Sequence, residues 1–293
     1  MIPQYPDSRQ ITLEDKPTLD AVFLANQPEI SAYSFTNIFA WREMHNSTIS
    51  RIDDHILVLN STQQRRVCLQ PLGGGPAKPV IQEMMRRTDR PVVFERLSEH
   101  VKPDFEECGF TVESDRDNSD YVYASRDLIE LAGRKYDAKR NFVARAKSQI
   151  GYEYVRMEAA VALECEDFAD LWCEDKMCET VDGLRRERCA VNQMLINFDS
   201  LGVIGGAIRV DGAIVAFSIG ERLNDDTLVI HVEKADSGIG GLYQLINNEF
   251  CAAEAGAYKY VNREQDLGVA GLRKAKESYH PVRMIPTFRA KTP

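Results

Sequence analysis

The segment from 227 to 266 constrains the fold more than any other part of the chain. Within it, an alternating apolar stretch at 228–233 precedes a glycine-rich loop at 237–241, an amphipathic stretch at 242–255 and a second strand-like stretch at 258–262. Parallel strands cannot be joined by a tight hairpin and need a crossover, which is usually a helix. The order therefore predicts a parallel strand pair joined by a helix, as in an α/β fold.

The glycine-rich loop has two interpretations. Gly238, Gly240 and Gly241 permit a close approach of the backbone, and exposed N–H groups at a helix start can bind a phosphate. The acidic Asp236 precedes these glycines and disfavours a phosphate there. An ordinary strand-to-helix turn has the same composition, so anion binding and a plain turn both stay open.

Polar side chains gather toward the ends of the two predicted strands. Strict alternation places His231 and Glu233 on one face of the first strand, and Asn262, Glu264 and Asp266 on one face of the second. Ligands bind at the carboxyl ends of strands in open α/β sheets, and a glutamate or histidine there can deprotonate an acceptor amine. We expect a catalytic cluster, with a half-exposed strand face as the alternative.

Three further polar residues of this region are candidates for the site. Glu249 falls on the apolar side of the predicted helix, where a carboxylate needs a partner, so a structural ion pair is the alternative to ligand binding. Lys274 and Tyr279 follow on the last predicted helix. Tyr279 is a candidate general acid for a leaving group, and a packed tyrosine is the alternative.

A basic amphipathic stretch at 127–149 lies near the middle of the chain. Its periodicity predicts a helix with Lys135 in the apolar stripe, Arg134 and Asn141 on one flank, and Arg140 on the opposite side. A lysine directed toward the interior needs an acid, a phosphate or access to water. We expect a clamp for an anionic substrate, and the alternative is a solvated basic helix.

The first half of the chain repeats the order of elements found in the second half. Strands between 47 and 70 precede a glycine loop at 73–75, a helix at 79–87 and a strand at 91–95. The repeated order predicts two copies of one α/β fold, each a mixed sheet flanked by helices.

We expect each copy to be one domain. The predicted N-terminal domain spans 1–125 and the C-terminal domain spans 126–293, the second beginning with the basic helix that joins them. A length of 293 residues suits two domains of ordinary size.

Composition excludes several classes of protein. A formal net charge of -9 and a pI near 5.2 argue against nucleic-acid binding through a general positive field, so any such contact must be local. No run of about 18 apolar residues is present, so no membrane span is expected. The seven cysteines include no C-x-x-C pair, and Cys173 and Cys178 do not share a helix face well. These features predict reduced thiols, no metal site and a cytoplasmic protein.

Several stretches carry a resemblance to a known family. The stretches 133–141 and 261–268 are the most specific, and together with 34–41, 232–236 and 243–250 they resemble the phosphatidylglycerol lysyltransferase C-terminal domain-like family. The resemblance implies two tandem GNAT-like acyltransferase folds with a cleft between the halves. Better-known members of that family transfer an amino acid from aminoacyl-tRNA to a membrane lipid.

The leading hypothesis is a soluble GNAT-like acyl- or aminoacyl-transferase with an amine or hydroxyl acceptor. The donor carbonyl would lie near Glu233 and Asn262, the acceptor beside Lys135 and Arg140, and Glu233 or Glu264 would be the base. No cofactor is required; the glycines favour acyl-CoA as donor, and the basic helix favours aminoacyl-tRNA. The alternative is a non-catalytic module that binds an anionic small molecule in the cleft between the halves.

Overall fold

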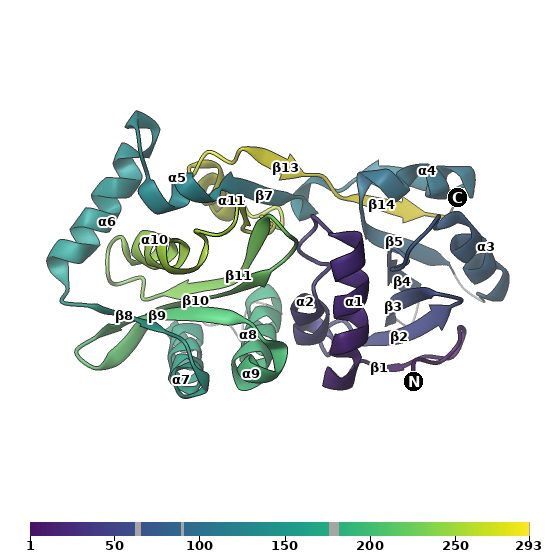
Figure 1. Ribbon diagram of the computed structural model, residues 1–293, viewed down its shortest axis with the longest axis horizontal. Helices are drawn as coiled ribbons and strands as arrows, with labels where there is room; N and C mark the ends of the chain where they lie inside the picture. The colour runs from purple at the N-terminus through teal and green to yellow at the C-terminus, as the bar shows by residue number, and fades with distance from the viewer. Residues whose placement is uncertain (62–65, 89–90, 176–181, 293) are drawn as a thin grey trace. The chain divides into compact units, whose positions relative to one another are not determined.

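The chain forms two compact units, each built on a seven-stranded mixed sheet (Figure 1). The computed structural model describes residues 1–61, 66–88, 91–175 and 182–292. Unit 1 comprises Met1–Asp120, Gln265–Ala270 and Met284–Pro293, and unit 2 comprises Tyr121–Glu264 and Gly271–Arg283. Two segments from late in the sequence, 265–270 and 284–293, therefore belong to the same unit as the N-terminal part of the chain.

The sheet of unit 1 contains a parallel strand pair joined by α3 (Lys78–Arg87). Its strands, in order across the sheet, are β1 (Arg9–Gln10), β2 (Ser47–Ile52), β3 (His55–Ser61), β4 (Arg66–Leu69), β5 (Val92–Leu97), β14 (Phe288–Lys291) and β6 (Thr111–Ser114). β4 and β5 are parallel, whereas β14 lies antiparallel between β5 and β6. A strand from late in the sequence therefore joins β5 to β6.

The core of unit 1 is an aromatic and aliphatic layer between the sheet and two helices. Ile81 and Met84 are one helical turn apart on α3 and are fully buried, as is Phe105 on α4 (Lys102–Glu107). Phe94 of β5 packs edge-on against Phe105, with ring centroids 4.7 Å apart. Two further helices, α1 (Lys16–Asn26) and α2 (Phe35–Trp41), complete this unit.

The sheet of unit 2 contains the parallel pair predicted from the sequence. Its strands, in order across the sheet, are β13 (Arg283–Ile285), β7 (Asp120–Ala124), β12 (Tyr260–Asn262), β11 (Thr227–Ala235), β10 (Ala213–Arg222), β9 (Ile204–Val210) and β8 (Glu153–Arg156). β11 and β12 are parallel and are joined by α10 (Leu242–Glu254), which confirms the predicted crossover. Their pairing ends at Val229 and Asn262.

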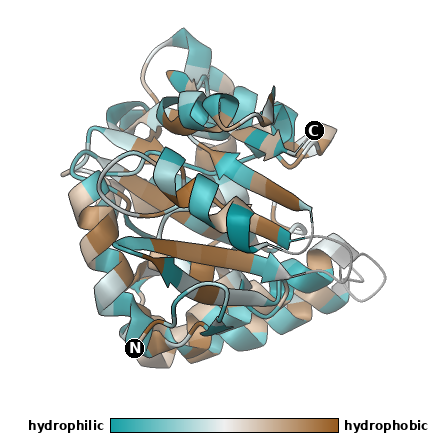
Figure 2. Cartoon of the chain, turned by 90° about the vertical axis from the view of Figure 1, so that its right-hand side faces the viewer, coloured by the Kyte–Doolittle hydropathy of each residue, from teal (hydrophilic) through white to brown (hydrophobic). Residues whose placement is uncertain are grey.

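Helices cover both faces of the sheet in unit 2. On one side lie α10, α5 (Ser125–Glu130) and α6 (Asp137–Gln149), and on the other lie α7 (Ala159–Asp175), α8 (Asp182–Ile196) and α9 (Phe198–Leu201) (Figure 1). A short helix, α11 (Ala270–Glu277), precedes β13. Hydrophobic and hydrophilic residues are interleaved along the helices and strands (Figure 2). Among the helices of the described residues, none is long and apolar enough to cross a membrane.

The predicted basic helix is interrupted. α5 ends at Glu130, Leu131 adopts a left-handed conformation with φ 48°, and Gly133 has φ 82°. A single 3-10 turn, Arg134–Tyr136, then leads into α6. The break removes the helical periodicity that placed Lys135 in an apolar stripe, and its side chain is about half exposed.

The cysteines agree only in part with the prediction of reduced thiols. Cys173 of α7 forms a disulfide, which contradicts that prediction. The other cysteine of that stretch, Cys178, lies outside the described residues. Among the described residues, the free cysteines are Cys68, Cys108, Cys165, Cys189 and Cys251.

Gly241 allows α6 to approach the loop before α10, and this predicts a stability effect. Its φ is 92°, and a Cβ atom there would lie 2.3 Å from the carbonyl oxygen of Phe142. We expect Gly241→Ala to lower the free energy of unfolding by about 1–3 kcal/mol, as measured by urea denaturation. Gly240→Ala is the matched control, because the nearest atom to its added Cβ, Arg145 Cζ, lies 3.5 Å away. Equal losses in both variants would contradict this explanation.

Candidate active site

The candidate site lies in unit 2, where β11 and β12 diverge. β12 ends at Asn262, whose Oδ1 atom accepts a hydrogen bond of 2.8 Å from the backbone N–H of Glu264. Glu264 has a φ of 56°, so the chain turns away from the strand direction. β11 continues to Ala235. The side chains of β11 beyond Val229 therefore meet the turn at 263–264 instead of a paired strand.

A β-bulge divides the polar side chains of β11 into two groups. Ile219 of β10 opposes Val232, but the next residue, Gly220, opposes Ile230, so His231 is the extra residue of the bulge. Strict alternation predicted His231 and Glu233 on one face. That prediction is wrong, because the extra residue breaks the alternation and the two side chains have different partners.

His231 lies between two carboxylates. Its Nε2 atom is 2.9 Å from Oε1 of Glu221, its Nδ1 atom is 2.9 Å from Oε1 of Glu264, and its side chain is 0% exposed. Burial lowers the pKa of His231, but the hydrogen bonds and charges of the two glutamates outweigh burial and raise the pKa to about 10. His231 is therefore an imidazolium at neutral pH with both N–H groups engaged, and it has no lone pair to act as a base.

This buried imidazolium predicts a pH dependence of stability. The pKa of about 10 in the folded state exceeds the ordinary value of about 6.5, so the stabilisation is complete below about pH 6.5 and is lost as the pH rises toward 10. We expect the free energy of unfolding to fall by about 2 kcal/mol from pH 6 to pH 8, because the stabilisation by protonated His231 decreases over this range. Urea denaturation at several pH values measures this slope.

Two histidine variants test the assignment of the slope. His231→Gln should remove it, whereas His280→Gln, at an exposed histidine, should keep it. A slope that survives in His231→Gln would show that another group titrates.

Glu233 holds a buried arginine that the sequence did not single out. Its Oε2 atom accepts a 2.5 Å hydrogen bond from Nη2 of Arg263, and its Oε1 atom accepts one of 2.8 Å from Nδ2 of Asn247 on α10. The Arg263 side chain is only 14% exposed. Because both carboxylate oxygens are engaged, Glu233 is arranged to orient Arg263 and Asn247.

The groups around Glu233 keep unused hydrogen-bonding capacity. Nε and Nη1 of Arg263, Oδ1 of Asn247 and Oγ of Ser218 are buried and have no partner among the described residues. Ser218 lies directly opposite Glu233 in the β10–β11 register. Buried polar groups almost always have partners in native proteins. The cluster therefore presents two donors of a fixed cation, one acceptor and one hydroxyl to a bound molecule or to water.

Lys139 of α6 and Arg263 are two cations that lie against one aromatic ring, that of Tyr279. The Nζ atom of Lys139 lies 4.0 Å from the ring centroid of Tyr279, and Cζ of Arg263 lies 4.7 Å from that centroid. Nζ also donates a 2.6 Å hydrogen bond to Oγ of Ser278. Burial and the charge of Arg263 lower the pKa of Lys139 to about 8. A lysine tuned to this range can take and return a proton near neutral pH.

Tyr279 itself is buried, and burial raises the pKa of its hydroxyl. It packs edge-on against Tyr123, with ring centroids 6.3 Å apart. Its face thus lies against the two cations Lys139 and Arg263, while Glu233 supplies one negative charge. The local balance is positive within an acidic chain, which suits a negatively charged group or an oxygen that gains negative charge during a reaction.

Other residues predicted for the site form structural contacts elsewhere. Asp266 belongs to unit 1, is 0% exposed and pairs with Arg116, whose Nη1 atom lies 3.0 Å from Oδ2. Glu249 accepts hydrogen bonds from Nζ of Lys147 at 2.7 Å and from the hydroxyl of Tyr152 at 2.8 Å. For Glu249 the interpretation as a structural ion pair with the basic helix is confirmed.

The residues of the predicted anion clamp are also engaged locally or exposed. Nζ of Lys135 lies 3.1 Å from Oδ2 of Asp127, and Arg140 donates to the carbonyl oxygens of Leu131 and Gly133. Arg140 thereby holds the corner between α5 and α6. Arg134 and Asn141 are exposed, and so is Lys274, the candidate on the last predicted helix.

An acidic residue of the glycine loop, Asp236, accepts a hydrogen bond from the backbone of the loop itself. The backbone N–H of Gly238 donates a 2.7 Å hydrogen bond to Oδ1 of Asp236, and Gly241 serves the close packing against α6. A phosphate at Gly238 would have to displace a carboxylate that is covalently part of the loop. The part of the chain that the structure describes contains no group of histidine, cysteine, aspartate or glutamate residues suited to a metal ion.

Sequence reasoning missed Lys139, Arg263, Asn247, Ser218 and Glu221. Lys139 lies inside the stretch 133–141 and Arg263 inside the stretch 261–268, the two segments with the most specific family resemblance. That resemblance was the available signal. Periodicity gave none, because Arg263 lies beyond the end of β12 and the helical register of Lys139 depends on the break before α6.

Comparison with known proteins gives one family. Residues 26–291 match the family model described as phosphatidylglycerol lysyltransferase, C-terminal. No match was found among curated proteins. A solved structure from Bacteroides thetaiotaomicron, a conserved protein of unknown function, is 34% identical with a TM-score of 0.91, and the match covers 100% of both chains.

Two more distant structures share the fold. The C-terminal domain of a putative lysylphosphatidylglycerol synthetase from Agrobacterium fabrum is 15% identical with a TM-score of 0.69, over 96% of this chain and 93% of that one. L-PGS from Bacillus licheniformis is 17% identical with a TM-score of 0.65, over 100% of this chain and 94% of that one. Both structures share the fold of this chain, and the parallel, helix-joined strand pair in each unit confirms the predicted fold class of mixed sheets flanked by helices. The chain belongs to the family of the phosphatidylglycerol lysyltransferase C-terminal domain.

Proposed function

We propose that this protein transfers an acyl or aminoacyl group from an activated ester to an amine or hydroxyl acceptor, at the site of Lys139, Glu233 and Arg263. The family supports a fold of the acyl- and aminoacyl-transferase type. The observation that carries the proposal is Arg263, which is held by Glu233 at the divergence of two parallel strands and whose Nε and Nη1 atoms are buried and have no partner among the described residues.

Arg263 is suited to bind the carbonyl oxygen of the donor. When a nucleophile attacks an ester, the carbonyl oxygen becomes negatively charged in the tetrahedral intermediate. Fixed donors in a site with little water stabilise that charge without reorganisation. Glu233 and Asn247 keep the guanidinium oriented, and they are positioning residues in this scheme.

Lys139 is suited to move the proton. In its neutral form it accepts a proton from the acceptor amine, the amine nitrogen then bonds to the donor carbonyl carbon, and the ester C–O bond breaks. The leaving alkoxide takes the proton back from Lys139, so that protons and charge balance over the cycle. Glu233 and Glu264, the carboxylates expected from the sequence, are occupied by Arg263 and His231 respectively.

The glycine loop bears on the choice of donor. Because Asp236 occupies the N–H of Gly238, the loop favours a carrier that needs no pyrophosphate there, and aminoacyl-tRNA meets this condition better than acyl-CoA. Exposed Arg134 and Arg145 give the α6 region local positive charge for RNA phosphates. The proposal requires no resident cofactor and places the protein in the cytoplasm, where tRNA is charged.

A transfer assay tests the proposal. Purified protein is incubated with radiolabelled aminoacyl-tRNAs or with labelled acetyl-CoA, together with amino acids, amino alcohols or phosphatidylglycerol vesicles. Transfer of label from aminoacyl-tRNA to an acceptor is the expected result.

The positive cluster at Lys139 and Arg263 also suits an anion that is bound without reaction, which is the second candidate function. Binding of an anionic ligand at the cluster with no product from either donor would favour this non-catalytic module.

A further inference from the structure

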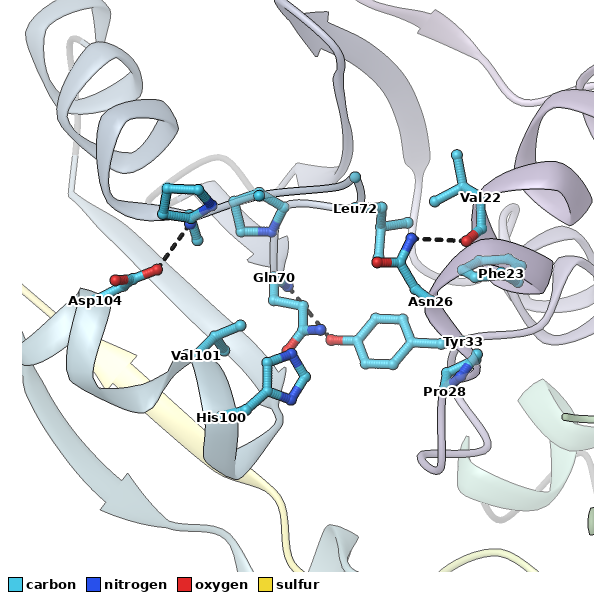
Figure 3. A pocket seen from close by; sticks show the side chains of 15 residues that line it. Val22, Phe23, Asn26, Pro28, Tyr33, Gln70, Leu72, His100, Val101 and Asp104 are labelled. Carbon is cyan, nitrogen blue, oxygen red and sulfur yellow. Dashed lines mark hydrogen bonds between the residues drawn. The ribbon is translucent and has the colours of Figure 1, made fainter.

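Unit 1 contains a cavity of about 360 Å³ that shares no residue with the candidate active site. It lies at the carboxyl end of β4, where the loop 70–77 leads into α3, and residues of α1 and α4 form other parts of its wall (Figure 3). The loop contains Gly73–Gly75, the glycine loop of the element order that both halves of the chain share. The volume of the cavity falls within the range of small-molecule sites.

The position of the cavity matches where ligands bind in α/β sheets. β4 and β5 are parallel and joined by α3, and such sheets bind ligands beyond the carboxyl ends of their strands. Gly73 is needed there, because a Cβ atom on it would lie 2.8 Å from the ring of His55.

The one fixed charge among the residues that line the cavity favours a cation over an anion. The lining residues include no lysine or arginine, and Asp104 is the one carboxylate among them. Oδ2 of Asp104 accepts a 2.7 Å hydrogen bond from the backbone N–H of Ala77, at the start of α3. A built-in carboxylate thus fills the position where a glycine loop and a helix start would hold a phosphate.

The remaining wall combines apolar surface with one free amide. Phe23, Leu72 and Val101 are buried apolar residues. Oε1 of Gln70 accepts hydrogen bonds from the N–H and the hydroxyl of Ser98 at 2.9 and 2.8 Å. The amide NH₂ of Gln70 is therefore the end left to donate, and Gln70 itself is 9% exposed. The hydroxyl of Tyr33 is fixed by donating to the carbonyl oxygen of Arg96 at 2.6 Å.

We propose that this cavity binds a small organic amine in its ammonium form. The ammonium group pairs with Asp104, an apolar body lies against Phe23, Leu72 and Val101, and the NH₂ of Gln70 donates to an oxygen of the ligand where one is present. This binding site is independent of group transfer in unit 2, so the inference stands or falls separately from the proposed function.

A matched pair of probes tests the sign of the charge. 3-Phenylpropylamine and 3-phenylpropionate have the same apolar body and opposite charges, and their affinities are measured by calorimetry and by protein-observed NMR. The amine is expected to bind at least tenfold more tightly than the carboxylate, with shifts at residues around Asp104 and Gln70. Equal affinities, or no binding of the amine at millimolar concentration, would overturn the proposal.

Three variants locate the binding. Asp104→Asn keeps an oxygen for the N–H of Ala77 but removes the charge, and it should weaken amine binding by roughly 10-fold to 100-fold. Val22→Trp should block the cavity from α1 and abolish binding. Glu106→Gln is the control, since Glu106 lies on the same helix, pairs with Lys102 at 3.5 Å and is not part of the cavity wall. Undiminished binding in either cavity variant, with its fold verified by circular dichroism, would refute the assignment.

Discussion

Replacing Lys139 with arginine is expected to lower the turnover number of the proposed transfer by about 100-fold to 10,000-fold, the usual effect of losing a general base. Arginine keeps the positive charge near Tyr279 but does not release a proton in the working pH range. The substitution therefore separates proton transfer from simple attraction of an anion. Single-turnover kinetics with the donor identified in the transfer assay measure the effect.

The pH dependence gives the second arm of this test. Lys139 acts in its neutral form, and its pKa is lowered to about 8, so the wild-type rate should rise with pH and level off above about 8. Lys147→Arg, on the same helix and paired with Glu249, should keep the wild-type rate and profile. Near-full turnover in Lys139→Arg would show that the lysine contributes charge only.

Replacing Arg263 with methionine is expected to lower the free energy of unfolding by about 3–5 kcal/mol. Removing one partner of a buried ion pair leaves the other charge without compensation, and here the remaining charge is Glu233, whose side chain is 14% exposed. Asn247 donates to the same carboxylate, so its orientation is also affected when Arg263 no longer holds Glu233 in place. Urea denaturation at pH 7 measures the loss.

The double variant Arg263→Met with Glu233→Gln distinguishes an unpaired charge from a loss of packing. If the buried carboxylate causes the damage, the double variant should recover most of the stability. Arg126→Met serves as a comparison, because Arg126 is 82% exposed and its partner Glu130 is 44% exposed, and its loss should be smaller. A double variant as unstable as Arg263→Met would assign the effect to packing around Tyr123 and Tyr279.

The parallel strand pair of unit 2 could be predicted because local signals agree there. Alternating apolar residues in β11, a glycine loop and the amphipathic α10 all indicate the same crossover, and tertiary contacts do not override them. The bulge at His231 could not be predicted, since a bulge is one extra residue in a pairing register and leaves no periodic mark in the sequence. One residue was enough to separate His231 from Glu233.

The sequence indicated a region where polar side chains gather, but it did not indicate which of them contact one another. Glu233, Glu264 and Tyr279 do lie around the divergence of β11 and β12, yet their partners Arg263 and Lys139 come from a turn and from α6. Lys135 appeared to face inward only if the helix continued through Gly133, and the left-handed Leu131 interrupts it. Which of several neighbouring lysines becomes buried depends on that break, which side-chain periodicity does not report.

The insertion of β14 into the sheet of unit 1 sets an order on biosynthesis. β5 and β6 each pair with β14, so the edges of both strands stay open while the ribosome makes the whole of unit 2. Open strand edges recruit other chains, and domains otherwise tend to fold in the order of their synthesis. In this protein the unit that is begun first is closed last, and the nascent chain must keep an unfinished sheet from pairing wrongly until residues 288–291 emerge.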